Sequence, residues 1–244
     1  MTFKTQWLNC VAASALLVAT HAYAECEKPP LSDGIMGYSV CKDWPAHAGQ
    51  TITAKVVFTA DPSDPRGDSG MYDLDLAVVD SANAKVLASY RKDDAFNSDA
   101  VAFEGFSVDT ARYKLTAAQR AFGVRASFGH NSSANPYSKA DLTLYLKEGA
   151  TLRPVLQGLV VYKANGEYDG NCTGQGEQTT RTLDIGKTSS HGFADLIIRS
   201  STVATRNFKV GNECMDKTGK PTISLTTVHY DGQQYVLPEA LTGY

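Results

Sequence analysis

The segment 61–75 concentrates acidic side chains that could bind a metal ion. It holds five aspartates in fifteen residues: Asp61, Asp64, Asp68, Asp73 and Asp75. Carboxylate oxygens are hard ligands of the kind that Ca²⁺ prefers, so a calcium site is one interpretation of the segment. The spacing is not that of an EF-hand, which needs acidic residues at alternate positions and a glutamate at the twelfth. Pro62, Pro65 and Gly67 favour turns. A solvated turn is therefore the other interpretation.

Known catalytic arrangements find little support in the sequence. Gly67-Asp68-Ser69-Gly70 matches the core of the chymotrypsin-type nucleophile motif. However, Met71-Tyr72 follow it, and His47 precedes it by only about twenty residues, too few for that fold. Gly-x-Ser-x-Gly, His-x-His and His-Glu-x-x-His are absent. Asp73 and Asp75 share one strand face, yet nothing marks a base, a nucleophile or a cofactor. We therefore expect that the protein is not an enzyme.

The first 24 residues have the features of an export signal. Lys4 precedes an apolar stretch over residues 10–20, and Ala22-Tyr23-Ala24 provides the small-x-small site that signal peptidase requires. The stretch is too short to span a bilayer, which needs ~20 apolar residues. With Lys4 removed, 22 basic side chains remain against 26 acidic ones, an unfavourable balance for a nucleic-acid binder. These features predict a protein that is not membrane-embedded and is located in the periplasm or secreted.

Four cysteines remain after removal of the signal: Cys26, Cys41, Cys172 and Cys214. An even number in an exported chain indicates disulfides, and four cysteines allow three connectivities. No Cys-x-x-Cys pair supports a zinc site. Because short loops close most readily, we favour the pairs Cys26–Cys41 and Cys172–Cys214.

Short strands with period-2 alternation account for most of the chain. Residues 73–80 place Leu74, Leu76 and Val78 on one side, and residues 140–147 alternate in the same way. Similar runs rich in Val, Leu, Thr, Phe or Tyr occupy residues 51–59, 85–91, 101–108, 122–128, 155–163, 179–185, 193–199, 203–210 and 222–230. No segment shows sustained helical periodicity. The expected fold is all-β, an antiparallel sandwich or barrel.

Turn signals suggest where the chain divides. Asp231-Gly232 and Asn165-Gly166 are dipeptides typical of tight hairpin turns. Residues 167–178 are polar and rich in glycine, which favours a domain joint or a long loop. We therefore predict a β domain at 25–166, followed by a C-terminal β extension or a second small β domain at 167–244. A single continuous sandwich is the alternative.

Ser69-Gly70-Met71-Tyr72 fits the pattern Ser-Gly-x-Tyr. Through this motif, the export signal, the strand pattern and the cysteines, the chain resembles the periplasmic lysozyme inhibitors of Gram-negative bacteria. The resemblance is greatest to inhibitors of invertebrate-type lysozymes and to immunity proteins that block lysozyme-like toxins. It implies that a loop carrying Ser69, Gly70 and Tyr72 enters the cleft of a lysozyme-like muralytic enzyme. The alternative is that Tyr72 begins the strand at 73–80 and packs inward.

The chemistry of such a loop is consistent with inhibition. Glycoside hydrolases cut with two carboxyl groups, which the hydroxyls of Ser69 and Tyr72 could hydrogen-bond. Gly70 would allow close approach of the backbone. The main functional hypothesis is thus an exported, non-catalytic protein-binding module that inhibits a cell-wall hydrolase. The alternative is an envelope structural or glycan-binding protein, which would bind peptidoglycan through the polar loop at 129–137 or an open sheet face.

Overall fold

The computed structural model describes residues 26–243, so the expected signal at 1–24 lies outside the described residues. The described residues form twelve strands and one 3₁₀ helix: β1 (Gly37–Asp43), β2 (Gln50–Ala60), β3 (Gly70–Asp80), β4 (Val86–Ser98), β5 (Ala102–Lys114), β6 (Arg120–His130), β7 (Tyr137–Glu148), β8 (Thr151–Tyr168), β9 (Gly174–Ser190), β10 (Phe193–Val210), β11 (Glu213–Thr218), β12 (Thr222–Val228) and η1 (Glu239–Leu241). The all-β prediction is confirmed. Within residues 26–243, no helix is long and apolar enough to cross a membrane.

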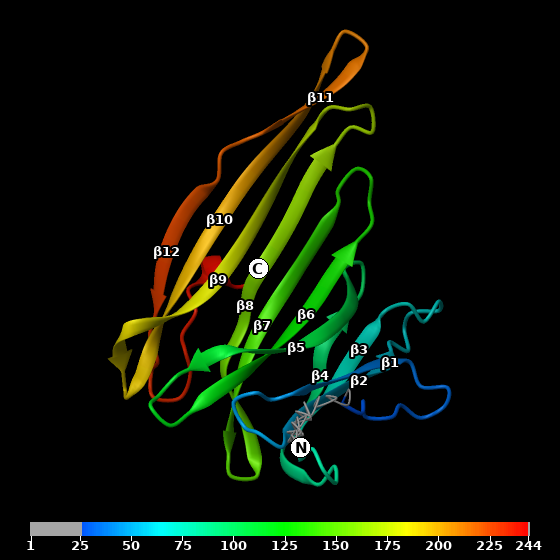
Figure 1. The fold of residues 1–244 in the computed structure, drawn as a ribbon. Helices are drawn as coiled ribbons and strands as arrows, with labels where there is room; N and C mark the ends of the chain where they lie inside the picture. Colours follow the sequence, from blue (N-terminus) through cyan, green and yellow to red (C-terminus); the bar gives the residue numbers. More distant parts are fainter. Residues whose placement is uncertain (1–25, 244) are drawn as a thin grey trace, which may run out of the picture.

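The strands form one open, mixed sheet that folds back on itself (Figure 1). Neighbouring strands follow the order β1-β2-β3-β4-β8-β7-β6-β5, while β9 joins β8 to β10, and β10 pairs with both β11 and β12. Strand β4 joins β8 through a single parallel pair, Ser89 with Thr151. The sheet is therefore mixed, whereas the prediction was an antiparallel one. It is also not closed into a barrel, which was one of the two predicted architectures.

The first hydrophobic core lies between β2–β4 and β5–β7. Every second residue is buried over 52–56 of β2 and over 70–78 of β3, as the alternation predicted, and these side chains pack against aromatic residues of β5 and β6. Its members include Trp44, Ile52, Val56, Leu74, Leu76, Phe103, Phe122, Val124 and Phe128. Each Å² of apolar surface that these side chains remove from water stabilises the fold by roughly 25 cal/mol, and this burial holds the two layers together.

The second core covers the opposite face of β7. Leu142, Leu144 and Leu146 point into it, whereas the intervening Tyr145 belongs to the first core. Strands β8, β10 and β12 and the C-terminal segment complete this cluster with residues that include Leu159, Leu196, Ile198, Val228, Tyr235 and Leu241. Strand β7 thus contributes to both cores, to the first through Tyr145 alone. The expected boundary at residue 167 lies inside β8, and the second core contains residues from both sides of that boundary.

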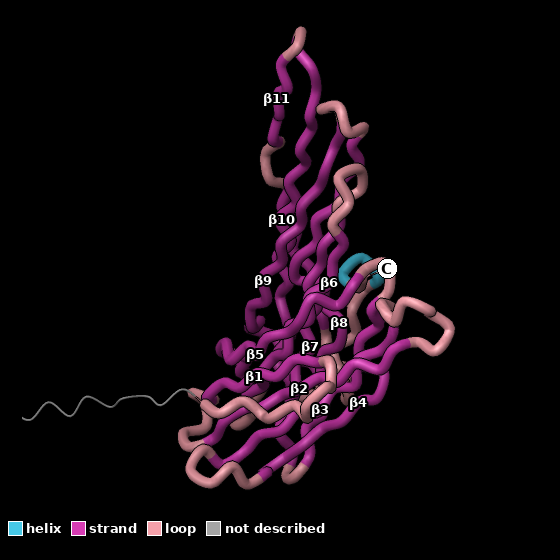
Figure 2. The backbone as a smooth tube through the Cα atoms, turned by 90° about the vertical axis from the view of Figure 1, so that its right-hand side faces the viewer, coloured by secondary structure: helices cyan, strands magenta, loops and turns pink. Residues whose placement is uncertain are grey.

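The ends of β8, β9 and β10, with β11, project beyond the two cores as an arm (Figures 1 and 2). Asn165-Gly166 lies inside β8 rather than in a turn, so that turn prediction is wrong. The turn occupies residues 169–173, where the carboxylate of Asp169 accepts hydrogen bonds from the backbone N–H groups of Asn171 and Thr173. The ring of Tyr168 occupies the space that a Cβ at Gly174 would need. The glycines of this segment thus accommodate an aromatic ring within a hairpin, rather than forming a long loop.

Both predicted disulfides are confirmed. Cys26 and Cys41 have Cα atoms 5.9 Å apart, and Cys172 and Cys214 have Cα atoms 5.7 Å apart, both within the usual range. The first disulfide ties the N-terminal segment to β1. The second joins the β8–β9 turn to β11 and so closes the end of the arm.

Candidate functional site

The first two aspartates of segment 61–75 hold the loop in shape. Asp64 accepts hydrogen bonds from the backbone N–H groups of Arg66, Asp68 and Ser69 at 3.0, 3.1 and 2.8 Å. Asp61 accepts from the backbone N–H and the hydroxyl of Ser63, both at 2.8 Å. These bonds favour the ionised form and lower the pKa of both carboxyl groups. Both carboxylates therefore act as caps of backbone turns.

The other three aspartates pair with basic side chains. Arg91 contacts Asp73 at 3.1 Å and Asp75 at 3.0 Å on the outer face of β3. Asp68 lies 3.6 Å from the guanidinium of Arg66 in the loop. Within residues 26–243, no three His, Cys, Asp or Glu side chains meet as a possible metal site. The structure therefore lends no support to calcium, because the chain's own donors already occupy these carboxylates.

The Ser-Gly-x-Tyr motif lies at the base of this loop, and two of its residues are structural. Tyr72 is only 6% exposed, and its ring packs 4.9 Å from that of Phe58 and 4.6 Å from that of Phe103. A Cβ at Gly70 would lie 2.7 Å from the Phe58 ring, so glycine is needed there for packing. Ser69 is half-buried. Tyr72 thus packs inward, as the alternative interpretation expects, and its ring is not part of an exposed tip.

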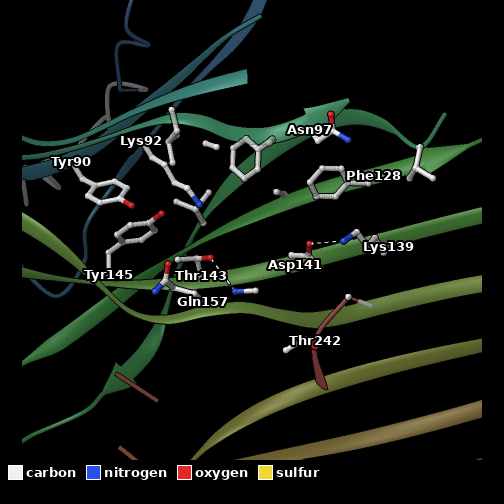
Figure 3. A pocket seen from close by; sticks show the side chains of 18 of the residues that line it. Tyr90, Lys92, Asn97, Phe128, Lys139, Asp141, Thr143, Tyr145, Gln157 and Thr242 are labelled. Atoms are coloured by element: carbon white, nitrogen blue, oxygen red, sulfur yellow. Dashed lines mark hydrogen bonds and ion pairs between the residues drawn. The ribbon is translucent and has the colours of Figure 1, made fainter. Parts of the chain in front are cut away.

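A cleft of about 500 Å³ opens between β4 and β6–β8, on the side of the first core where β4 diverges from β8 (Figure 3). Its volume falls in the range typical of small-ligand sites. Four aromatic residues contribute to its walls: Tyr90, Phe96, Phe128 and Tyr145. Its polar groups come from Lys92, Asn97, Asp99, Lys139, Asp141, Thr143 and Gln157. Thr242 and Gly243 form part of its rim.

Asp141 is the least satisfied polar group of the cleft. Its Oδ2 pairs with Nζ of Lys139 at 3.0 Å, and its side chain is 21% exposed. Its Oδ1 is buried without a hydrogen-bond partner among the described residues. Burial raises the pKa of this carboxyl group, and the ammonium of Lys139 offsets the rise only in part. The carboxyl group of Asp141 therefore lacks a hydrogen-bond donor at one of its two oxygens, on a residue that lines the cleft.

The aromatic residues give the cleft two apolar ends. Tyr90 and Tyr145 lie together at one end with ring centroids 5.3 Å apart, and burial raises the pKa of both phenols. At the other end, Phe96 and Phe128 have centroids 6.2 Å apart, and Nζ of Lys139 lies 4.9 Å from the centre of the Phe128 ring. Lys92, Thr143 and Gln157 lie between these ends, while Asn97, Lys139 and Asp141 lie near Phe128 (Figure 3). Such a site suits a ligand that combines apolar faces with hydroxyl or amide groups.

A serine, a histidine and an aspartate also meet where β9, β10 and β12 come together. The buried Asp195 accepts hydrogen bonds from Thr188 at 2.5 Å and Ser190 at 2.7 Å, and its Oδ1 lies 3.0 Å from Nδ1 of His229. In a catalytic triad the serine contacts Nε2 while the aspartate contacts Nδ1. Here the hydroxyl of Ser190 lies 3.3 Å from Nδ1, the same nitrogen that faces Asp195. The cluster joins strand ends and lacks the geometry of an activated nucleophile.

Searches against family models, curated proteins and solved structures return no match to this chain.

Sequence reasoning missed the cleft, although one signal was present. The leucines of residues 140–147 predict a strand with one apolar face and say nothing of its other face. That opposite face carries Lys139, Asp141, Thr143 and Tyr145, all of which line the cleft. The polar loop proposed for glycan binding, 129–137, connects β6 to β7, and its end residues His130 and Tyr137 stack with ring centroids 6.1 Å apart.

Proposed function

We propose that this chain is an exported, non-catalytic binding protein, and that its ligand is a glycan of the cell envelope held in the cleft between β4 and β7–β8. The observation that carries the proposal is the buried, unpartnered Oδ1 of Asp141 in an aromatic-walled cleft. A sugar ring offers hydroxyl donors to such an oxygen and apolar C–H faces to aromatic rings. The two disulfides are compatible with an oxidising compartment outside the cytoplasm.

The polar residues of the cleft would contact different groups of a bound glycan. The amide NH₂ groups of Asn97 and Gln157 donate to Asp99 and Gln234, and each keeps a second N–H that can meet a sugar hydroxyl. Lys92 can contact a carboxylate of an acidic glycan such as peptidoglycan, whereas Lys139 already pairs with Asp141. Tyr90 and Phe128, at opposite ends, would contact successive rings.

Sedimentation with purified sacculi and calorimetry with soluble peptidoglycan fragments test the proposal. The mature chain should sediment with sacculi, and Gln157→Ala should weaken binding of the fragments several-fold. Gln178→Ala is the matched control, because Gln178 is an exposed glutamine on the arm, away from the cleft. Absence of binding to sacculi and to every fragment, or equal weakening by both variants, would refute a glycan site in the cleft.

A second candidate function is inhibition of a lysozyme-like hydrolase by the loop at 61–70. The favouring observation is the order that Asp64 imposes, since it fixes three backbone N–H groups and leaves Arg66 and Asp68 exposed at the tip. A preformed loop loses less conformational entropy on binding than a flexible one does. The partner would be a basic muralytic enzyme, because the exported chain is acidic.

Hydroxyl deletions test the second candidate without disturbing the core. In a Ser69→Ala/Tyr72→Phe variant the buried ring remains, and only the two hydroxyls that the resemblance implicates are lost. Inhibition of a lysozyme panel by the unchanged chain, and its loss in this variant, would support the inhibitor function. Ser63→Ala, at another loop serine, is the control. Inhibition that survives the double replacement would exclude these two hydroxyls.

A further inference from the structure

Strand β12 is an unprotected edge of the sheet. It pairs with β10 over Thr222–Val228, and its other side faces outward at the boundary of the molecule (Figure 1). The backbone N–H and C=O groups on that side have no partner within residues 26–243. An open edge of this kind is a template for another strand.

Two other edge strands, β11 and β5, carry features that discourage pairing. Strand β11 contains Glu213, Asp216 and Lys217 among its six exposed residues. Strand β5 is interrupted by register shifts after Phe103 and after Asp109. Charges and bulges of this kind are the usual protection of an edge. Strand β12, with the sequence TISLTTV, has no charge and no proline, and its pairing with β10 has no register shift.

The exposed apolar residues of β12 lie on one face. Leu225 is 68% exposed and Ile223 is 44% exposed, and they alternate with Ser224 and Thr226 on the opposite face. That opposite face leads to Val228 in the second core. Leu225 and Ile223 thus place two exposed apolar side chains beside the open backbone edge.

The sequence of β12 is complementary to itself in antiparallel pairing. With Leu225 on a two-fold axis, Leu225 lies opposite Leu225 of a second copy, and Ile223 lies opposite Thr227. Ser224 then lies opposite Thr226 on the other face. Each of these cross-strand pairs is favourable, and no like charges meet. A two-fold interface requires this self-complementarity, whereas a foreign strand does not.

We infer that two copies of this chain associate through antiparallel pairing of their β12 strands, which makes one continuous sheet across a two-fold axis. Backbone hydrogen bonds along β12 provide the attraction, and the paired Leu225 side chains set the register. The cleft and the loop at 61–70 take no part in the interface, so the inference is independent of the proposed function.

Sedimentation equilibrium of the disulfide-intact mature chain tests the inference. The unchanged chain should be a dimer, and Leu225→Lys should be a monomer, because it sets two ammonium groups opposite each other at the axis. Met215→Lys is the matched control, since Met215 is an exposed apolar residue of β11 and its replacement should leave the dimer intact. A chain that stays monomeric up to about 0.5 mM, or a Leu225→Lys variant that stays dimeric, would overturn the inference.

Hydrogen exchange gives a second measurement that needs no variant. Protection of the outward-facing β12 amides should rise with protein concentration, while exchange of the β11 amides stays constant. Exchange in β12 that is independent of concentration over the range where a dimer forms would place the interface elsewhere and contradict pairing through β12.

Discussion

Asparagine in place of Asp141 separates the stability of the fold from ligand binding. Burial raises the pKa of Asp141 in the folded chain above its unfolded value, with Lys139 opposing the shift. The ionised carboxyl group is therefore stabilised less in the folded state than in the unfolded one. Its contribution to stability is fully present below about pH 4 and is lost as the pH rises through the raised pKa. At neutral pH the uncharged Asp141→Asn variant should melt at a temperature equal to or above that of the unchanged chain.

Binding should change in the opposite direction. The introduced amide would keep its oxygen toward the ammonium of Lys139 and place its NH₂ group at the position of Oδ1, the oxygen that has no hydrogen-bond partner. A ligand hydroxyl that donates to the carboxylate would then face another donor. A hydrogen bond to a charged group contributes about 1.5–3 kcal/mol, so the dissociation constant should rise about 10- to 150-fold. The side chain is largely buried, which limits the competition from water.

Calorimetry with soluble peptidoglycan fragments and thermal unfolding at neutral pH give the two readouts. Asp184→Asn is the control, because Asp184 is an exposed aspartate on β9 and its replacement should alter neither readout appreciably. Unchanged binding by Asp141→Asn would remove Asp141 from contact with the ligand. A clear fall in melting temperature would show that the ion pair with Lys139 outweighs the cost of burial, and would refute the reasoning on stability.

Three further predictions concern the scaffold. Replacing Cys172 and Cys214 by alanine opens a loop with a sequence separation of 42 residues. The chain-entropy model gives a loss of about 4 kcal/mol in denaturant unfolding, and a loss under about 1 kcal/mol would indicate that the arm unfolds separately from the cores. Leu144→Ala empties a fully buried position and should cost about 2–5 kcal/mol in urea, so a near-neutral result would contradict the second core. Hydrogen bonds, that from Thr188 foremost, lower the pKa of Asp195, so its stabilisation is present above about pH 4 and is lost as the pH falls through the lowered pKa. The melting temperature of Asp195→Asn should fall less at acidic pH than that of the unchanged chain. An equal fall in both would exclude this linkage.

The strands and the disulfides could be predicted because both depend on local information. Alternation in 73–80 and 140–147 reports which side chains are buried in β3 and β7, whatever sheet covers them. Cys26 and Cys41 lie fifteen residues apart, and the two connected segments stay close in the fold. Local spacing was enough in these cases.

Other features depend on tertiary packing and left no local signal. Asn165-Gly166 has the composition of a turn, but here Gly166 makes room for the ring of Tyr168, together with Gly174 on the neighbouring strand. Strand β8 therefore continues beyond Gly166. Tyr72 lies near the start of β3, beside a polar loop, and its burial follows from Phe58 and Phe103, two aromatic partners on other strands. Neither partner can be identified from the residues next to Tyr72.

The polar row on β7 shows why the cleft, rather than the motif loop, carries the functional argument. Lys139 and Thr143 are accounted for by the open side of the first core, where β4 diverges from β8 and water can reach β7. Exposure to water does not explain Asp141, because its Oδ1 is buried and has no hydrogen-bond partner. The leucines of β7 point away from it, into the second core. Leaving a buried acceptor without a partner costs about 1–3 kcal/mol, a penalty that an apolar residue at this position would avoid. Asp141 thus departs from the rule that buried polar atoms have hydrogen-bond partners. Such a departure is expected where a ligand supplies the missing donor.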